Sequence, residues 1–341
     1  MGRKNKKYSL NLHQQAYKRL VSMQAFGKSK EIAKENDMEF DKIYSFNTYE
    51  TYWKHTKYFV RWIEKNHPEC TTLKAARKYV NEWLQSRVDQ ELSAWTVQTE
   101  AKALGKLYGI RPDDPNYFKP PKRKREDIKR SRVDAVRDRH FSVTNNDEFI
   151  KFCKGVGGRR EDIRKLRGED LWTRQEMEEE IRFSAMNPDY EIDSTDKLAL
   201  ANMKEALIMF PDQEYFIHFI RSKGGRSRFS PIIGRDKQQI INRMVNTIPG
   251  KKVWEHVPVN ADIHSYRGDY ATAIYKRYAK NGTDISANEK ILVNGKYKSR
   301  LYVCRGDEAR KRLDRAAMLK CSKALGHNRE SVVADNYLRG I

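Results

Sequence analysis

The sequence has no long apolar run and few cysteines. No stretch approaches the ~18 consecutive apolar residues of a membrane helix, and residues 1–15 lack the apolar segment of a signal peptide. The four cysteines, at 70, 153, 304 and 321, lie far apart and form no CxxC pair. Neither a zinc ribbon nor a disulfide framework is therefore predicted. These absences predict an intracellular chain with reduced thiols and no membrane partner.

Common signatures of nucleotide and metal hydrolases are also missing. The sequence contains no GxGxxG motif, Walker phosphate loop, HExxH or GxSxG. Nucleotide hydrolysis, zinc hydrolysis and serine esterase chemistry therefore lack support. There is no clustered Asp/Glu site of the kind that holds two magnesium ions in some DNA-cutting enzymes. We expect neither a cofactor nor a metal.

What the chain has in excess is positive charge. Its 341 residues include 68 Lys+Arg against 46 Asp+Glu, a formal net charge of +22. A charge of this size favours a polyanion, and the usual one is the phosphate backbone of nucleic acid. The alternative is a solvated surface without a partner. The length predicts two domains.

Helical patterns dominate the first part of the chain. We predict a basic N-terminal arm over 1–40, interrupted at Gly27, and a helical domain over 41–110. Its helices are expected from a cap at Asn47 or Thr48, over 72–87 and over 94–108. Aromatic side chains at helical spacing favour a core, with a base-stacking platform as the alternative: Trp53, Trp62, Tyr79 and Trp83.

A basic, proline-containing linker is predicted over 111–141. Four prolines in 112–121 break the helical pattern, and residues 119–139 hold ten Lys/Arg against four acids. Such a strap could lie along DNA, with a nuclear localisation signal or a merely solvated linker as alternatives. The predicted DNA contacts are Lys122, Arg123, Lys124, Arg125, Lys129 and Arg130.

Residues 142–341 are predicted to form a second domain, and the whole chain to be mostly α with small β elements. We expect a helix capped by Asn145 or Asn146, one near Gly158, and a helical run to about 209 after a polar, acidic stretch at 173–197. Two strands should flank the glycine pair within 214–233, and a hairpin should turn at Asn294-Gly295. Further helices are expected over 261–280 and 305–326.

Three motifs in this domain resemble the signatures of the tyrosine recombinase (phage integrase) family. GVGGRREDIRKLRGEDL, at 155–171, resembles the first, with Arg159 at the catalytic arginine position and Asp162 at the acid position. HSYRGDYAT, at 264–272, resembles the second. LGHNRESVVADNY, at 325–337, resembles the third and ends in Tyr337. Lys223 matches the lysine of the family's hairpin.

The resemblance implies a helical core-binding domain followed by a mixed α/β catalytic domain. It also implies strand cleavage by transesterification, with Tyr337 as the nucleophile. A free phenol has a pKa of ~10 and must lose its proton as it attacks. Arginine forks suit the non-bridging phosphate oxygens. The implied catalytic set is Arg159, Lys223, His264, Arg267, His327 and Tyr337.

Within that set, His264 is expected as proton acceptor or phosphate ligand, and His327 as a donor to the phosphate. Lys223 is the expected general acid for the 5′ oxygen. Arg221, Arg226 and Arg228 crowd the same hairpin, and we expect Arg226 and Arg228 to contact the DNA backbone. Arg159 has a simpler alternative, an ion pair with Glu161 or Asp162 on its own helix.

By resemblance the protein is a site-specific recombinase or integrase of a mobile genetic element. It would act as a homotetramer on two DNA duplexes carrying recombination sites, with accessory DNA-bending proteins as candidate partners. A prokaryotic or viral source would place it in the cytoplasm, at the nucleoid. The alternatives are a type IB topoisomerase and a non-catalytic DNA-binding regulator. Relatives in this family commonly continue past the tyrosine with a helix that docks into the neighbouring protomer, whereas four residues follow Tyr337 here. By resemblance we therefore expect protomers to couple through another element. The candidates are the insertion at 280–304, which separates the second and third motifs, and the N-terminal arm.

Overall fold

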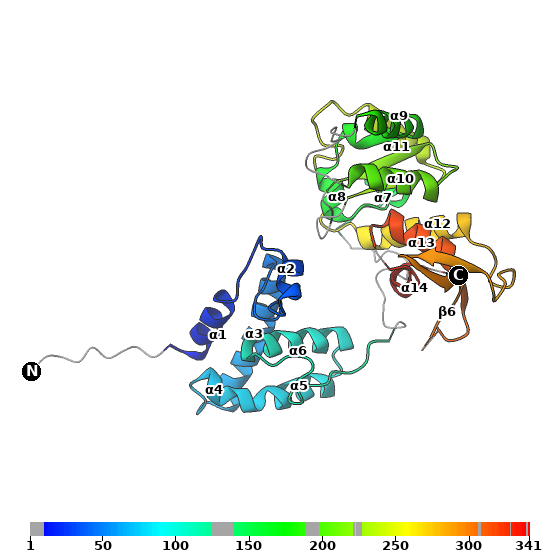
Figure 1. Ribbon diagram of the computed structural model, residues 1–341. Helices are drawn as coiled ribbons and strands as arrows, with labels where there is room; N and C mark the ends of the chain where they lie inside the picture. The colour runs from blue at the N-terminus through cyan, green and yellow to red at the C-terminus, as the bar shows by residue number, and fades with distance from the viewer. Residues whose placement is uncertain are drawn as a thin grey trace, which may run out of the picture. The chain divides into compact units, whose positions relative to one another are not determined.

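A computed structural model describes residues 10–124, 140–187, 198–220, 222, 227–305, 308–327, 329–338 and 340–341. The chain divides into two compact units, Met1–Arg123 and Lys124–Ile341. The division falls within the predicted linker. Among the described residues, no helix combines the length and apolar character needed to span a membrane. As predicted, the chain is mostly helical with small antiparallel strands (Figure 1).

The first unit is helical throughout its described elements. These are α1 (Leu12–Val21), α2 (Lys30–Glu35), α3 (Phe46–Asn66), α4 (Leu73–Ala76), a 3-10 turn η1 (Arg77–Tyr79), α5 (Val80–Asp89) and α6 (Ala94–Tyr108). Helix α6 matches its predicted range, and Gly109 ends it in the left-handed conformation at φ 70°. The helix predicted over 72–87 is instead divided by η1, and α3 begins two or three residues earlier than predicted because Ser45 is its cap.

One core joins α1 with α3, α4, α5 and α6 of the first unit. Phe59, Val60 and Ile63 of α3 are buried together with Trp83 and Leu104, which supports the core interpretation of the aromatic pattern. Leu12, Ala16 and Leu20 of α1 belong to the same core. Because α1 packs against α3, residues 12–21 share the core of the predicted helical domain.

The second unit is built on a three-stranded antiparallel sheet. It contains α7 (Asp147–Val156), α8 (Arg160–Lys165), a 3-10 turn η2 (Gly168–Asp170), β1 (Leu171–Thr173), α9 (Arg174–Met186), α10 (Ala199–Met209), β2 (Tyr215–Phe219), β3 (Arg228–Pro231), α11 (Lys237–Val245) and α12 (Ile263–Tyr278). The strand order is β1-β2-β3, with Ile217 opposite both Leu171 and Ser230. Strands β2 and β3 confirm the predicted pair.

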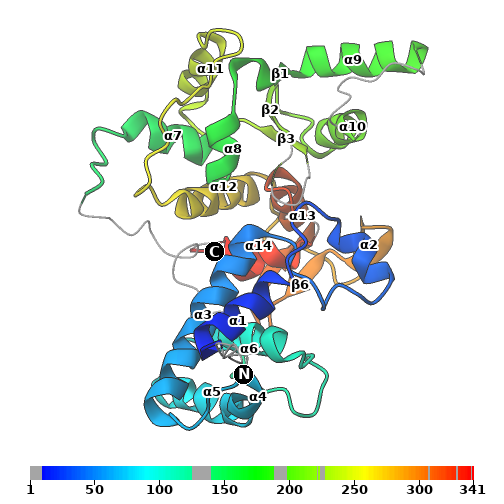
Figure 2. The same ribbon diagram turned by 90° about the vertical axis from the view of Figure 1, so that its left-hand side faces the viewer.

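Both faces of this sheet are covered. Phe216 and Phe229 face one core, which includes Tyr270 of α12, whereas Ile217 and Phe219 face a second core with Ile163 of α8. Figure 2 shows α8 and α10 on different sides of the strands, and α12 contributes residues to both cores. Burial on both faces fits the mostly apolar sequence of β2, whereas β3 also buries the polar side chains of Arg228 and Ser230.

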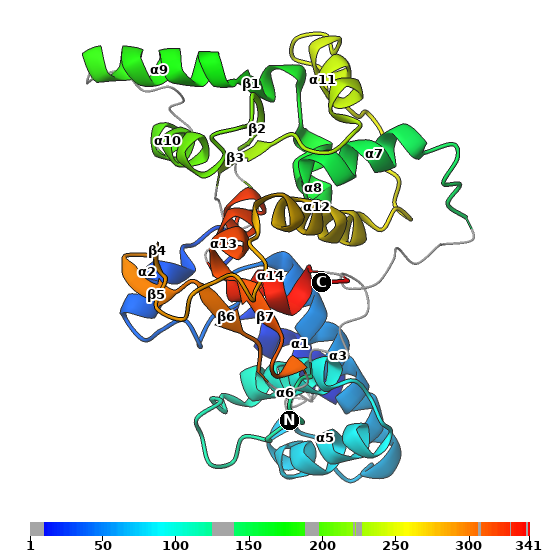
Figure 3. The same ribbon diagram turned by 90° about the vertical axis from the view of Figure 1, so that its right-hand side faces the viewer.

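The chain then continues through two β ribbons to the C-terminal helices. The elements are β4 (Lys290–Val293), β5 (Lys296–Ser299), β6 (Leu301–Val303), β7 (Arg312–Asp314), α13 (Arg315–Ala324) and α14 (Ser331–Asn336). Both ribbons lie beside α13 (Figure 3). Asn294 and Gly295 have φ values of 49° and 75°, which confirms the predicted turn.

Two predictions for the second unit are wrong in detail. The polar stretch from residue 173 begins with helix α9, whose cap Thr173 exchanges hydrogen bonds with Glu176. The helix predicted over 305–326 starts only at Arg315. Asp314 caps it, accepting a hydrogen bond from Ala316 N at 2.8 Å, and the preceding residues pair as strand β7.

Candidate active site

Arg159 is positioned by a glycine turn between α7 and α8. Gly157 ends α7 at φ 62°, and a Cβ atom there would lie 2.2 Å from the Tyr270 ring, so only glycine fits. Arg159 is the N-cap of α8, with an extended backbone whose N–H donates to Asp162 Oδ2 at 3.0 Å. The Arg159 guanidinium donates to Ser222 Oγ at 2.6 Å and lies 3.9 Å from Asp162.

Arg267 enters the same region from α12. Its side chain is 2% exposed and donates to the carbonyl oxygens of Gly157 and, at 3.1 Å, of Leu325. These two carbonyls belong to the first and third sequence motifs. Arg267 therefore ties together the three segments that resemble recombinase signatures.

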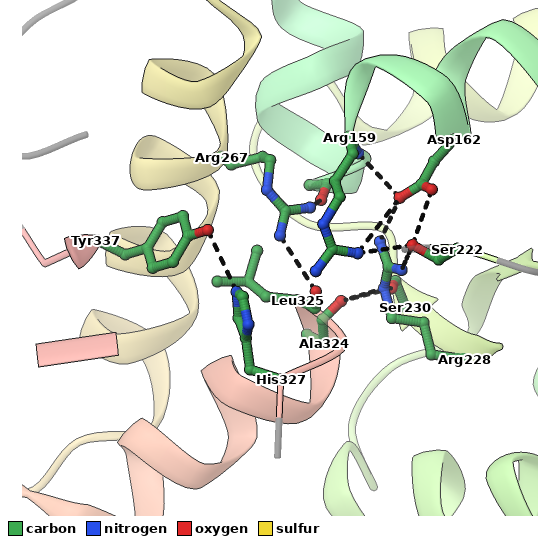
Figure 4. Close-up of polar contacts among 11 residues, drawn as sticks. Arg159, Asp162, Ser222, Arg228, Ser230, Arg267, Ala324, Leu325, His327 and Tyr337 are labelled. Atoms are coloured by element: carbon green, nitrogen blue, oxygen red, sulfur yellow. Dashed lines mark hydrogen bonds and ion pairs between the residues drawn. The ribbon is translucent and has the colours of Figure 1, made fainter. Parts of the chain in front are cut away.

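Tyr337 lies at the end of α14, with its ring beside His264 and Arg267 of the second motif and His327 of the third. It is 5% exposed. Its ring is parallel to that of His264, with centroids 5.4 Å apart, and the Arg267 guanidinium lies 5.7 Å from the ring centroid. His327 Nε2 lies 3.2 Å from Tyr337 Oη, within hydrogen-bonding distance (Figure 4). The phenol oxygen therefore faces an imidazole and adjoining cations.

The structure thus brings together five of the six predicted catalytic residues: Arg159, His264, Arg267, His327 and Tyr337. The sixth, Lys223, lies outside the described residues, and its predicted role stays a prediction. The same holds for Arg226. Glu161 pairs with Arg164 rather than Arg159, whereas Asp162 contacts Arg159 as the simpler alternative suggested.

Three guanidinium groups set the electrostatics of the site. Burial, together with repulsion by Arg267, Arg159, Arg228 and His264, lowers the pKa of His327 from 6.5 to about 3. Near neutral pH His327 is therefore an uncharged imidazole, which can accept a proton. Burial raises the pKa of Asp162, but Arg228 and the hydrogen bonds from Arg159 and Ser222 outweigh that effect, so its pKa is lowered and it stays ionised. The remaining surplus of positive charge favours an anion.

The depressed pKa of His327 predicts acid sensitivity. Between about pH 6.5 and 3 the unfolded chain binds a proton at His327 that the folded protein does not, so stability falls as the pH is lowered. His327→Gln, which cannot titrate in this range, should lose less unfolding free energy on acidification. Urea unfolding followed from neutral to mildly acidic pH would measure the difference. Equal slopes for the two proteins would contradict the prediction.

The prediction made for Arg228 is wrong. It was expected to contact the DNA backbone, but its side chain is buried and bound to Asp162, Ser222 and the Ala324 carbonyl. A guanidinium with these partners is not on the surface. Ser222 and Arg228 were both missed as members of the site, because the sequence shows a polar hairpin and gives no sign that these two residues turn inward.

The structure describes only part of the predicted basic linker over 111–141. Lys122, Arg123 and Lys124 are exposed, and the Arg123 guanidinium lies 5.2 Å from the centroid of the Trp95 ring. Arg125, Lys129 and Arg130 lie outside the described residues. Whether the exposed residues contact DNA therefore stays a prediction.

Within the described ranges, no group of three or more His, Cys, Asp and Glu side chains could hold a metal ion. No protein-family model matches the sequence, and comparison with curated proteins gives no match either. The geometry around Tyr337 and the sequence motifs therefore carry the functional argument.

Proposed function

We propose that this chain is a tyrosine-type site-specific DNA recombinase. Tyr337 Oη would attack a backbone phosphate of duplex DNA and form a 3′-phosphotyrosine bond. The observation that carries the proposal is the placement of a buried tyrosine beside a neutral histidine and the guanidinium of Arg267. A buried phenol surrounded by anion-binding groups has an evident chemical use, whereas a core tyrosine needs none of them.

The charges suit the reaction. A phosphodiester gains negative charge as the fifth oxygen approaches phosphorus. Arg159 and Arg267 are held by neighbouring backbone and side-chain oxygens, so they need not reorganise as this charge develops. Lys would bind less well here, because its ammonium lacks the planar pair of N–H groups with which a guanidinium fork bonds two phosphate oxygens.

Geometry favours His327 as the proton acceptor, a role that the sequence suggested for His264. His327 Nε2 is the imidazole atom at hydrogen-bonding distance from Oη, whereas the His264 ring lies parallel to the phenol ring. A phosphate bound by the arginines would add negative charge near His327 and raise its proton affinity. The bond from Oη to phosphorus would then form as the proton moves to Nε2.

The bond from phosphorus to the 5′ oxygen breaks in the same step. The leaving oxygen needs a proton, and we propose that Lys223 supplies it, which yields a free 5′-hydroxyl end. The phosphotyrosine bond retains the energy of the original linkage, so reversal by a 5′-hydroxyl rejoins DNA without ATP. Exchange between two duplexes requires several protomers, and we propose a tetramer.

Covalent capture tests the proposal without knowledge of the target sequence. The protein would be incubated with a pool of nicked duplexes of random sequence, so that the short 5′-hydroxyl fragment leaves and traps the intermediate. Denaturation should leave DNA attached to the protein, and peptide mapping should place it on Tyr337. If no pool gives an adduct, the proposal fails.

Captured sequences would then separate recombination from its two alternatives. Two copies of a captured site on separate duplexes should exchange strands if the protein is a recombinase. Relaxation of supercoiled plasmid without exchange would indicate a topoisomerase. Sequence-specific binding without any adduct would indicate a non-catalytic regulator.

A further inference from the structure

A buried polar network lies beneath Arg159. It contains Asp162 from α8, Ser222 after β2, and Arg228 at the start of β3, which are 8%, 6% and 5% exposed. Ser222 Oγ donates to Asp162 Oδ1 at 2.8 Å and accepts from Arg159 at 2.6 Å. Asp162 Oδ2 accepts from the Arg159 backbone N–H. Both the backbone and the guanidinium of Arg159 are therefore fixed by these two side chains (Figure 4).

Arg228 donates hydrogen bonds to both Ser222 and Asp162. One terminal nitrogen donates to Ser222 Oγ at 3.1 Å, and the other donates to Asp162 Oδ2 at 3.2 Å. Its guanidinium also lies 4.4 Å from the centroid of the Phe219 ring on the paired strand. Because Ser222 directly precedes Lys223 in the sequence, the same bonds fix the chain just before the proposed general acid.

The third partner of Arg228 is the segment that carries His327. Arg228 Nε donates to Ala324 O at 2.8 Å, and Ser230 Oγ donates to the same carbonyl at 2.7 Å. Two residues later, Gly326 has φ 70°, and a Cβ atom there would lie 3.1 Å from Arg228 Cδ. Ala324, at the end of α13, and Gly326 therefore both contact Arg228, and His327 directly follows Gly326.

A buried arginine in this position is costly. Burial lowers the pKa of Arg228 to about 10, so it remains charged near neutral pH, and Asp162 is its compensating charge. Buried ion pairs often contribute little net stability compared with apolar side chains of the same volume. The directional hydrogen bonds of such a pair do fix the positions of the groups that they join. A contribution to folding stability is therefore a poor explanation for the burial of Arg228 at this position.

We propose that Arg228 is a positioning residue that aligns Arg159 and His327 with the scissile phosphate and does not itself contact DNA. This inference rests on the proposed function for its catalytic readout. It differs from the expected surface role, since the residue acts from the protein interior through Asp162, Ser222 and Ala324.

The first test is Arg228→Lys, which keeps the charge but cannot bond all of these partners. We expect covalent-complex formation to slow about 10- to 100-fold, as for residues that orient the groups in direct contact with a reaction centre. DNA affinity should stay at the wild-type value. The matched control is Arg243→Lys, because Arg243 bonds Glu148 and the Val253 carbonyl and lies over Trp254 in the same unit. The control should lower thermal stability without slowing the reaction.

A second variant and a second readout make the outcome decisive. Ser222→Ala keeps the Asp162–Arg228 ion pair and removes only the hydroxyl that contacts Arg159, so it should fold and react slowly even if Arg228→Lys does not fold. Inorganic phosphate titrated against the His327 imidazole NMR signals reports anion binding without DNA. Both variants should bind phosphate more weakly than the wild type.

Reaction rates and phosphate affinities together distinguish a failure of the positioning role of Arg228 from a failure of the recombinase proposal. Wild-type reaction rates and phosphate affinities in the folded variants would overturn the inference and leave the recombinase proposal intact. Failure of the wild type to form any adduct, with phosphate binding still weakened by the variants, would overturn the recombinase proposal. The role of Arg228 in arranging the anion site would then stand.

Discussion

Replacing Tyr337 by Phe is expected to abolish the covalent protein–DNA complex while leaving the fold and DNA binding intact. The ring contacts His264 and Arg267, and phenylalanine preserves its size and shape. The variant loses one hydrogen bond, to His327, which corresponds to about 1 kcal/mol of stability. The loss of cleavage should be complete, because no oxygen remains to form the bond to phosphorus.

Neighbouring tyrosines should not replace Tyr337. Tyr270 donates its hydroxyl hydrogen to Pro231 O, and Tyr275 accepts from Asp314 N, and both are buried. Burial also raises the pKa of both phenols. Denaturing gels of wild type and Tyr337→Phe on the captured substrate would measure the effect. An adduct in the variant would show that another residue is the nucleophile.

Arg267→Lys is expected to reduce cleavage about 10²- to 10³-fold, the range seen when one preorganised donor to a developing negative charge is removed. Arg267 donates to Gly157 O and Leu325 O from separate guanidinium nitrogens. An ammonium group cannot reach both carbonyls and also contact a phosphate. The defect should therefore appear in the chemical step.

Single-turnover cleavage at saturating DNA would isolate that step. Thermal unfolding provides the control, because Arg267 is 2% exposed and its replacement will also cost stability. A normal cleavage rate in a less stable variant would assign Arg267 a purely structural role. A lower DNA affinity with normal cleavage at saturation would assign it to binding alone.

Local sequence signals predicted those parts of the fold that local chemistry determines. The Asn294-Gly295 turn requires two positive φ angles, and these two residues adopt them easily. Helix α6 was predicted over its full length because an apolar face and a terminal glycine mark it. Helix α9 was missed although Thr173 and Glu176 form a recognisable capping box. Strands β1 and β7 have three residues each and depend on partners distant in the chain.

The candidate site likewise contains some residues that local motifs indicate and others that depend on contacts between distant parts of the chain. Arg159, Arg267 and Tyr337 could be proposed because each lies in a motif that resembles a signature of the tyrosine recombinase family. The supporting network could not, because its members come from α8, the β2–β3 connection and α13. A sequence gives the identity of Arg228 but not the direction of its side chain. Its burial depends on the register of β3 against β2 and on the contact with Gly326.

The separation between the core of the first unit and the two cores of the second has a consequence for redesign. The described residues of the candidate site all lie in Lys124–Ile341, and the helices of the first unit have their own core. Substitutions in the core of the first unit therefore act on packing that is separate from the core containing Tyr337. A chimera that joins the second unit to an unrelated DNA-binding module should retain the proposed chemistry of Tyr337 and act at new sequences.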